Sequence, residues 1–570
     1  MYDPCSKCNA PEAAPRTGLA SLNRRLPLLP VLLLYIGLTA AVTWPQVQQV
    51  SSHVADVGDP LLNTWALAWV AHQVPFAPAH LFDANIFHPE RRTLAYSETL
   101  IAPALLGAPL LWLGAGPVQI YNLLFLAGFA LSGLTMALLV FELTGRTSAA
   151  LVGGAVFAFL PWRIDHYSHF QLLQTQWMPL ALLGLHRTIT HGRVRDGVLM
   201  GAGVGLQALT SMYNAVFLGL FMVPVALVLL RLGRITRRVA AAIAVSLVVA
   251  GLLAAPAVTA HLKAREVVGE RSRGEAEANS AVWTDFLASV PYSKLHGEWS
   301  KPFGGPERRL FPGLVAVLLT LVAIWPPLSR ARVAYVLGAL VAADLTLGFN
   351  GWLYPSLYDH FVALRGLRVP ARMGLMVGTA LAVLAGFGMA RLAGRMSVRW
   401  ERVLAAAFIA GVLTDVWVAP LGLTRVAEDA PLIYFDMLRD KGDPPRTTLA
   451  RRASDPPPTV LLELPIERDA PTYMYYSTFH WQRLVNGYSG FFSDRYIDLS
   501  NRLRKFPAAD SAALMGSLGV RYLTVHGEFL SPRDYQRITG ELDRMGPEFR
   551  LVNRRPWQGA EISLYRVTLP

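Results

Sequence analysis

The feature that most constrains this chain of 570 residues is a series of apolar runs, each long enough to cross a lipid bilayer as a helix. The first run, residues 27–44, follows Arg24 and Arg25 and has no small-residue cleavage site after it, so it predicts an uncleaved span rather than a signal peptide. With 53% hydrophobic and 16% charged residues, the composition fits an α-helical polytopic membrane protein of about 11 transmembrane helices. The ten further runs lie near residues 118–142, 147–162, 172–187, 197–212, 214–231, 239–260, 310–327, 333–349, 372–392 and 402–420.

Another run, residues 100–114, is short and contains Pro103, Gly107 and Pro109, so its crossing is ambiguous. If it does not cross, four arginine clusters lie on the same side as the basic N-terminus, whereas if it crosses they all lie outside. The positive-inside rule favours the first alternative, so we expect a re-entrant or interfacial segment. The clusters are Arg187/Arg193/Arg195, Arg231/Arg234/Arg237/Arg238, Arg330/Arg332 and Arg391/Arg395/Arg399/Arg402.

The same rule predicts a cytoplasmic N-terminus and a C-terminus on the outer face of the membrane. No Asn-x-Ser/Thr sequon occurs in the sequence, although this topology would place much of the chain outside. That absence favours a bacterial envelope over a eukaryotic secretory membrane. We therefore expect a multi-pass protein of the cytoplasmic (inner) membrane.

The chain divides into three parts by composition. Residues 1–25 form a cytoplasmic tail, and residues 26–420 form the transmembrane domain with outer loops 45–117 and 261–309. Residues 421–570 change character and predict an extracytoplasmic α/β domain of about 150 residues. Its strand-like runs are 460–464 and 520–525, and its helix-like segments are 496–505 and 508–517.

Several function classes do not fit the sequence. The formal charge of +13 comes mainly from arginine clusters between apolar runs, which argues against nucleic-acid binding. Cys5 and Cys8 are the only cysteines and form one C-x-x-C in the tail, so no other segment can carry a disulfide or a thiolate metal site. No Walker loop, G-x-S-x-G elbow or H-E-x-x-H occurs, which argues against an ATP-driven pump, a serine hydrolase and a zincin.

Polar residues gather in the first outer loop, and their density beside a membrane predicts a site. Asp59 precedes Pro60 and a helix-like run, so it could serve as a helix cap alone. Alternatively, it is a carboxylate fixed at the membrane surface and able to take a proton from a hydroxyl, with Asp56 as the alternative base. The polar residues of this loop are Asp56, Asp59, His72, His80, Asp83, His88, Glu90, Arg91, Arg92 and Glu98.

An acidic residue that opens a helix in the first outer loop, a tryptophan soon after it, a Pro-broken segment and a span ending in Thr144-Gly145-Arg146 together resemble the GT-C superfamily of membrane glycosyltransferases. The similarity covers about residues 25–260 in layout. The Asp-Glu pair of many relatives is absent, since Pro60 follows Asp59. Four further stretches resemble a bacterial branch of large GT-C-like proteins, namely Glu307 to Gly313, Arg368 to Arg372, Leu462 to Pro465 and Leu484 to Gly490.

The resemblance implies a sugar donor linked to polyprenyl phosphate, a base for an acceptor hydroxyl and cations for the leaving phosphate. It implies no certain cofactor, and a divalent metal is possible but unsupported. Arginine suits the phosphate because its planar fork of donors stays charged beside lipid, although contact with anionic headgroups is the alternative role. We expect Arg163 and Arg372 foremost, each at the outer end of a span. The other candidates for substrate binding are Arg91, Arg92, Arg368 and His166, with Arg365 also on the outer side.

Other polar and aromatic residues leave alternatives open. His166 and His169, beside Asp165, could bind a metal, but we expect solvated loop residues. Asp344 and Asp415 lie in apolar spans, where interhelical hydrogen bonding is the alternative to a functional role. The aromatic residues between 473 and 492 could stack on sugar rings, form a domain core or dock on the membrane half.

Two function classes follow. The first is a glycosyltransferase that moves a sugar from a polyprenyl-phosphate donor to a glycan, lipid or protein acceptor at the outer membrane surface. The second is a non-enzymatic translocator or assembly factor for envelope lipid or polysaccharide, which would use the same arginines to hold a lipid phosphate. An intact acidic site in residues 45–98 favours the first class.

Overall fold

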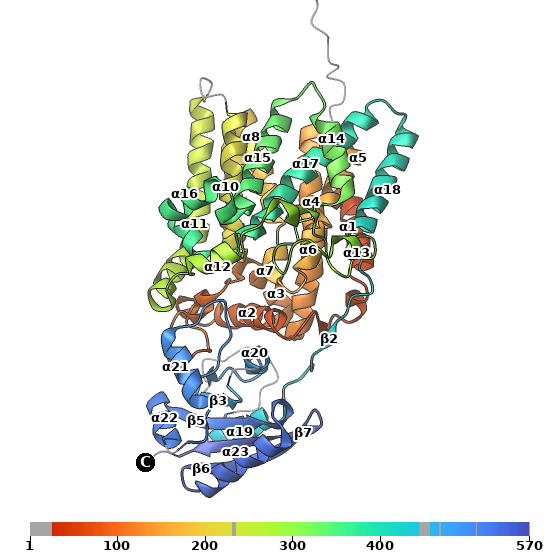
Figure 1. The fold of residues 1–570 in the computed structure, drawn as a ribbon. Helices are drawn as coiled ribbons and strands as arrows, with labels where there is room; N and C mark the ends of the chain where they lie inside the picture. The colour runs from red at the N-terminus through yellow and green to blue at the C-terminus, as the bar shows by residue number, and fades with distance from the viewer. Residues whose placement is uncertain (1–25, 231–234, 444–456, 467–468, 509, 569–570) are drawn as a thin grey trace, which may run out of the picture.

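The computed structural model describes residues 26–230, 235–443, 457–466, 469–508 and 510–568. It has two parts, a bundle of helices and a smaller part built on a sheet, stacked end to end (Figure 1). Cys5 and Cys8 of the predicted tail, as well as Arg231 and Arg234, lie outside the described residues.

Every apolar run predicted to cross the membrane contains a helix. Five helical stretches of the described chain are long and apolar enough to cross a bilayer, the longest being Arg237–Val268, so the protein is a membrane protein. The count of eleven crossings stays a prediction. The helices at these runs are α1 (Leu28–Val42), α4 (Pro117–Thr144), α5 (Thr147–Ala158), α8 (Trp177–His191), α9 (Val194–Thr210), α10 (Met212–Leu229), α11 (Arg237–Val268), α14 (Leu314–Ile324), α15 (Arg330–Thr346), α17 (Gly374–Ala393) and α18 (Val398–Asp415).

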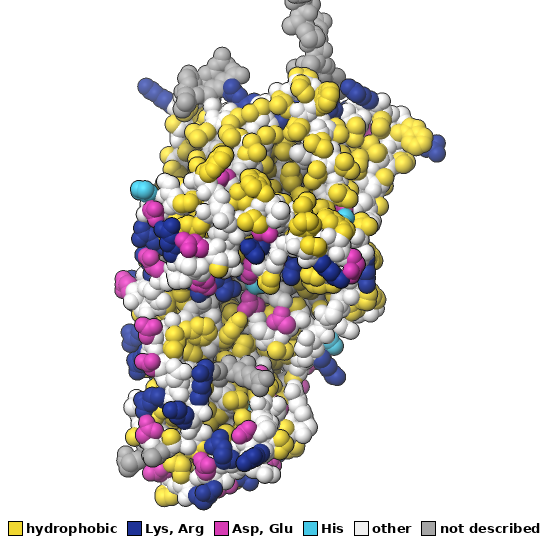
Figure 2. All heavy atoms as spheres, in the orientation of Figure 1, with side chains coloured by type: hydrophobic (Ala, Val, Ile, Leu, Met, Phe, Trp, Pro, Cys, Tyr) yellow, Lys and Arg dark blue, Asp and Glu magenta, His cyan; other side chains and the backbone are white. Residues whose placement is uncertain are grey.

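The outside of the bundle is apolar. In Figure 2 apolar side chains cover most of the bundle between Lys and Arg side chains at its upper end and the charged side chains where it approaches the second part. On α11, Leu247 and Leu252 are 70% and 72% exposed. Exposed leucines of this kind are stable only where the surrounding solvent is itself apolar, as lipid is.

The Pro-broken run forms α3 (Ile101–Trp112), with Pro109 inside the helix. Its 12 residues span about 18 Å, which is less than the bilayer core of about 30 Å. Its neighbour α2 (Asp59–Gln73) runs across the end of the bundle that faces the sheet (Figure 1). Shorter helices beside them are α6 (Pro161–Asp165), α7 (Phe170–Leu173), α12 (Arg273–Ala278), α13 (Gly297–Ser300) and α16 (Leu353–His360).

The second part is a five-stranded mixed sheet in the order β4-β3-β5-β7-β6, with helices packed on it. Strand β3 pairs in parallel with β4 and β5, and β7 pairs antiparallel with β5 and β6. All five residues of β3 are buried, as expected for a strand covered on both faces. The elements are β3 (Val460–Leu464), β4 (Arg483–Leu484), β5 (Val520–His526), β6 (Phe549–Trp557), β7 (Ala560–Val567), α19 (Ile433–Lys441), α20 (Ala470–Ser477), α21 (Asp494–Leu503), α22 (Ser511–Leu518) and α23 (Pro532–Arg544).

The two parts are joined by backbone pairing as well as by packing. The first outer loop lies along β4, where the amides of Phe87 and His88 donate to the carbonyls of Asn486 and Leu484. A second join is the two-residue pair of β1 (His53–Val54) and β2 (Thr424–Arg425). These contacts fix the second part against α2, as Figure 1 shows.

Candidate active site

The first turn of α2 presents Asp59 without using it as a cap. The N-cap residue is Gly58, and no side chain caps this helix. The amide of Gly58 instead donates to the Asp56 carboxylate over 2.8 Å, and the hydroxyl of Ser168 donates to the other Asp56 oxygen. The alternative in which Asp59 serves only as a cap is therefore wrong, and Asp56 is the residue that fixes the turn.

Asp59 faces groups from three distant segments. The hydroxyl of Tyr488, in the second part, donates to Asp59 Oδ1 over 3.2 Å, and His169 Nε2 lies 3.6 Å from Asp59 Oδ2. Burial raises the pKa of Asp59, and the Tyr488 hydrogen bond and the charge of Arg372 offset part of that rise. Burial also lowers the pKa of His169 to about 3, assisted by the charge of Arg372. A neutral imidazole therefore faces the Asp59 carboxylate at neutral pH.

Glu307 forms the second carboxylate of this cluster. Arg372 donates to it through two nitrogens, Nε to Oε2 over 2.8 Å and Nη2 to Oε1 over 2.5 Å. His166 Nε2 lies 3.2 Å from Oε2, while its Nδ1 faces the carbonyl of Trp162 over 2.9 Å. Burial would raise the pKa of Glu307, but the His166 hydrogen bond and the Arg372 charge outweigh it and hold that pKa far below its usual range.

The backbone at Glu307 supports a functional position. Its φ of +67° lies in the left-handed region, which costs a non-glycine residue energy. The carboxylate that this conformation turns inward lies 3.9 Å from His169 Nε2 through Oε1. His169 thus lies between Asp59 and Glu307, and the cluster joins α2, the turn after α6, the loop before α14 and the segment before α17.

Arg368 is the cation of the cluster without a carboxylate partner. Within the described part of the chain, its half-buried side chain forms no hydrogen bond or ion pair. Its charge nevertheless acts on Asp59, Tyr488 and His169, so it lies near all three. Close to it, Arg271 stacks 3.9 Å from the ring centroid of Phe491. The guanidinium of Arg368, which has no partner among the described residues, is therefore available to bind an anionic ligand.

The structure corrects several expectations for the arginines and histidines. Arg163 has no exposed surface, donates to the Leu173 carbonyl over 2.9 Å and to the Thr175 hydroxyl, and packs under Phe129, so it cannot meet a lipid phosphate. Arg372 does lie beside Asp59, but Glu307 takes two of its nitrogens. His166 is not a solvated loop residue, since it is 1% exposed, and the half-buried His169 faces Asp59 and Glu307.

The remaining predicted residues lie outside the cluster. Arg91 is exposed, and it lines a pocket beyond the far end of α2, whereas Arg92 is half-buried and donates its amide to Asp83. Asp415 accepts from His296 and from the first turn of α14, and Asp344 accepts the amides of Trp352 and Leu353. These two carboxylates hold helix ends.

The aromatic cluster divides between packing and the site. Tyr473, Tyr475, Tyr476 and Trp481 are at most 4% exposed, so they are core and docking residues rather than sugar platforms. Tyr488 is the member that reaches Asp59. No group of three or more His, Cys, Asp or Glu side chains that could hold a metal ion occurs among the described residues.

The sequence alone did not connect three residues of the cluster, Glu307, His169 and Tyr488, with Asp59. Each is distant from Asp59 along the chain, so spacing alone could not connect them. A signal for Glu307 did exist, because a carboxylate next to Gly304 and Gly305 lies in one of the stretches that resemble GT-C-like proteins.

Comparison with solved structures identifies the fold. The chain superposes on the arabinofuranosyltransferase AftD from Mycobacteria with a TM-score of 0.60 at 14% identity, over 95% of this chain and 40% of AftD. ArnT from Cupriavidus metallidurans gives a TM-score of 0.48 at 14% identity, over 94% and 98% of the two chains. The oligosaccharyltransferase from Archaeoglobus fulgidus gives 0.44 at 14% identity, over 87% and 67%.

No model of a protein family matches the sequence, and no curated protein does. The chain spans less than half the length of AftD, so the likeness concerns the part that the two share. At 14% identity that likeness establishes architecture rather than activity. The chain therefore is a membrane protein with the GT-C fold, the fold of the glycosyltransferases that it resembles.

Proposed function

We propose that this protein transfers a sugar from a polyprenyl-phosphate-linked donor to an acceptor hydroxyl at the outer face of the cytoplasmic membrane. The observation that carries the proposal is the cluster around Asp59. A half-buried carboxylate with a raised pKa lies near the guanidinium of Arg368, which has no partner among the described residues, at the end of an apolar helix bundle. That is the pair of groups that sugar transfer from a phosphate ester needs.

The proposed step uses these groups as follows. The acceptor oxygen forms a bond to the anomeric carbon of the sugar, and Asp59 takes the proton of the acceptor hydroxyl. The bond from the anomeric carbon to the phosphate oxygen breaks, and polyprenyl phosphate leaves with the electron pair. Arg368 stabilises the phosphate charge through charge-assisted hydrogen bonds.

The other cluster residues hold these two in position. Tyr488 donates to Asp59 Oδ1, so Oδ2, which His169 faces at 3.6 Å, is the oxygen that takes the proton of the acceptor. Glu307, fixed by Arg372 and His166, sets the position of His169 beside Asp59. Because its pKa is about 3, His169 is neutral in the working pH range and does not compete with Arg368 for the phosphate.

Comparison of Asp59→Asn with wild type tests this function. The readout is sugar transfer by the purified full chain in proteoliposomes, with polyprenyl-phosphate sugars extracted from bacterial membranes as donors. Asn keeps the size of the side chain but is a very poor base, so we expect the rate to fall by about 10²–10⁴-fold. The matched control is Asp498→Asn, because Asp498 is an exposed carboxylate on α21.

Two outcomes would contradict the proposal. A folded Asp59→Asn protein that transfers sugar at the wild-type rate would remove Asp59 as the base. A wild-type protein that moves the lipid-linked sugar across the membrane without transferring it would favour the translocator class instead.

A further inference from the structure

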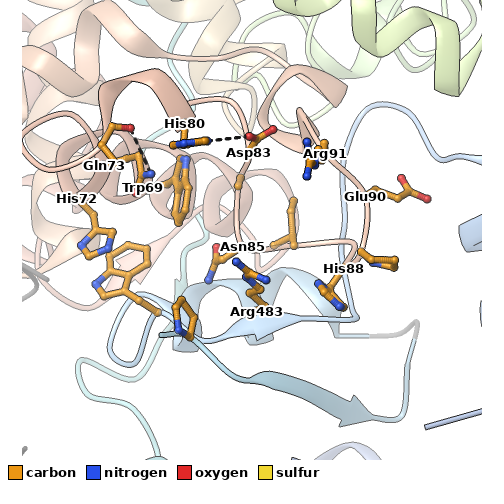
Figure 3. A pocket seen from close by; sticks show the side chains of 16 residues that line it. Trp69, His72, Gln73, His80, Asp83, Asn85, His88, Glu90, Arg91 and Arg483 are labelled. Carbon is orange, nitrogen blue, oxygen red and sulfur yellow. Dashed lines mark hydrogen bonds and ion pairs between the residues drawn. The ribbon is translucent and has the colours of Figure 1, made fainter. Parts of the chain in front are cut away.

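A separate pocket of about 570 Å³ lies between the C-terminal end of α2, the first outer loop and the second part of the chain. We call it the loop pocket. Figure 3 shows its labelled side chains converging from these three segments. Its volume lies in the usual range of small-molecule sites. The lining residues used below are Trp69, Asp83, Glu90, Arg91, Trp481 and Arg483.

The walls of the loop pocket are fixed by hydrogen bonds and stacked rings. Trp69 donates to the Leu81 carbonyl over 2.8 Å, and its ring centroid lies 5.9 Å from that of Trp481. His72 stacks on Trp481 with centroids 4.1 Å apart. Asn85 donates to the carbonyl of Gln482 across the two parts. Such a wall is preorganised, so a ligand need not order it on binding.

The charged groups of the loop pocket differ in whether they have partners. Asp83 accepts from the amide of Arg92 and lies 3.3 Å from His80. Glu90 accepts from the hydroxyls of Tyr96 and Ser493.

Arg91 and Arg483 are exposed, and their guanidinium groups form no hydrogen bond or ion pair with the residues that the structure describes. The pocket thus offers two free cations and carboxylates that are already satisfied.

We propose that the loop pocket binds the acceptor of the reaction, and that this acceptor is an anionic saccharide. The assignment rests on the proposed function. The free guanidiniums select a negative ligand, and the polar side chains of Gln73 and His80 in the pocket lining can form hydrogen bonds with sugar hydroxyls. The helix α2 connects the pocket to Asp59, since Gln73 lies about 21 Å along the helix axis from it. A glycan held at the pocket must therefore extend about 21 Å to present its end to Asp59.

Binding of two trisaccharides to the full-length protein tests this proposal. The probes are trigalacturonate, which carries carboxylates, and maltotriose, which is neutral, each titrated calorimetrically in detergent. We expect trigalacturonate to bind the wild type, and Arg91→Gln and Arg483→Gln each to weaken it by roughly 10 to 150-fold. Both arginines are exposed, so the variants should fold. The matched control is Arg533→Gln on α23, also exposed, which should bind as the wild type does.

Three results would overturn the proposal. These are equal binding of maltotriose, absence of trigalacturonate binding, or unchanged affinity in Arg483→Gln and Arg91→Gln. The measurement is independent of catalysis, because Asp59→Asn should bind trigalacturonate as the wild type does. Loss of sugar transfer and loss of trigalacturonate binding at the loop pocket are therefore measured in separate experiments.

Discussion

We propose Asp59 as the base because its carboxylate does not cap the helix that it opens. Asp56 fixes the turn instead, and Tyr488 takes only one oxygen of Asp59. Burial raises the pKa of Asp59, which makes the carboxylate a stronger base once it is ionised. Arg368, which forms no hydrogen bond or ion pair with the residues that the structure describes, is the cation that we propose for the phosphate.

Arg368→Gln should weaken binding of the lipid phosphate. Losing a charge-assisted contact costs about 1.5–3 kcal/mol, which corresponds to roughly 10 to 150-fold in affinity. The measurement is equilibrium binding of undecaprenyl phosphate to the full chain. Arg273→Gln is the control, since Arg273 is an exposed arginine of the same outer surface that pairs with Glu277 at 2.8 Å. Equal losses in both variants, or none in Arg368→Gln, would remove Arg368 from the phosphate site.

Tyr488→Phe should shift the pH dependence of transfer. The Tyr488 hydrogen bond lowers the pKa of Asp59, so its loss raises that pKa further. Asp59 must be ionised to accept a proton, and the acid limb of the rate profile should therefore move to higher pH. Tyr535→Phe, in which a distant tyrosine loses its hydroxyl, should leave the limb in place. A profile that falls at every pH without moving would mean that Tyr488 only supports the structure.

At the residue scale, the sequence predicted the acidic groups better than the cations. Asp59 and Asp56 could be found because they open a helix in a polar loop. Arg163 was misjudged because a position at the end of a span does not reveal whether the side chain points to the headgroups or into the bundle, where Leu173 and Thr175 bind it. His169 and Glu307 are brought together only by the tertiary fold.

At the scale of elements, α2 and the loop after β4 form the site together. Gly487 precedes Tyr488 and packs against Phe87 of the first outer loop, and a Cβ at Gly487 would lie 2.6 Å from that ring. The close approach is possible only for glycine. It sets the position from which Tyr488 reaches Asp59.

Gly487→Ala should therefore lower the rate of transfer although it changes no reacting group. The added methyl must displace the Phe87 ring or the loop. A displacement of about 1 Å typically lowers the rate about tenfold or more. Gly540→Ala on α23 is the matched control, since a Cβ there meets no atom within 4 Å. A wild-type rate in the folded Gly487→Ala protein would show that the loop does not position Tyr488.

The elements themselves were predictable to different degrees. Apolar length marked the long helices of the bundle because a helix in lipid must be apolar over the width of the bilayer, and the buried strands β3 and β5 showed as apolar runs. It did not mark the short helices α6, α7, α12, α13 and α16. Strands β6 and β7 were not predicted from the sequence. Since β6 is an edge strand with mostly half-buried or exposed residues, its sequence carries no alternating apolar pattern.

At the scale of the whole molecule, α11 runs from one end of the bundle to the other. Near its start, Gly192 of the α8–α9 turn packs against Val239, and near its end His261 contacts the Ser97 carbonyl of the first outer loop. The 32 residues of α11 span about 48 Å, which exceeds the bilayer core. The site and the second part thus lie at the end opposite the arginine-rich turns.

Reporter fusions should place these ends on opposite sides of the membrane. A reporter after Pro420 should report the outer side, and one in the turn at residues 192–193, between α8 and α9, should report the cytoplasm, because arginine-rich turns stay inside. Insertion of a reporter in a turn leaves the helices intact. Two reporters on the same side would contradict both the topology and the outward position of the Asp59 site.

The most direct measurement is an experimental structure of the full chain with undecaprenyl phosphate bound. We predict that the phosphate oxygens lie within about 3 Å of the Arg368 guanidinium nitrogens, on the side of the cluster that Asp59 faces. The lipid chain should extend along the apolar surface of the bundle. A phosphate bound at the opposite end of α11, or one that leaves Arg368 without contact, would contradict the account of the site.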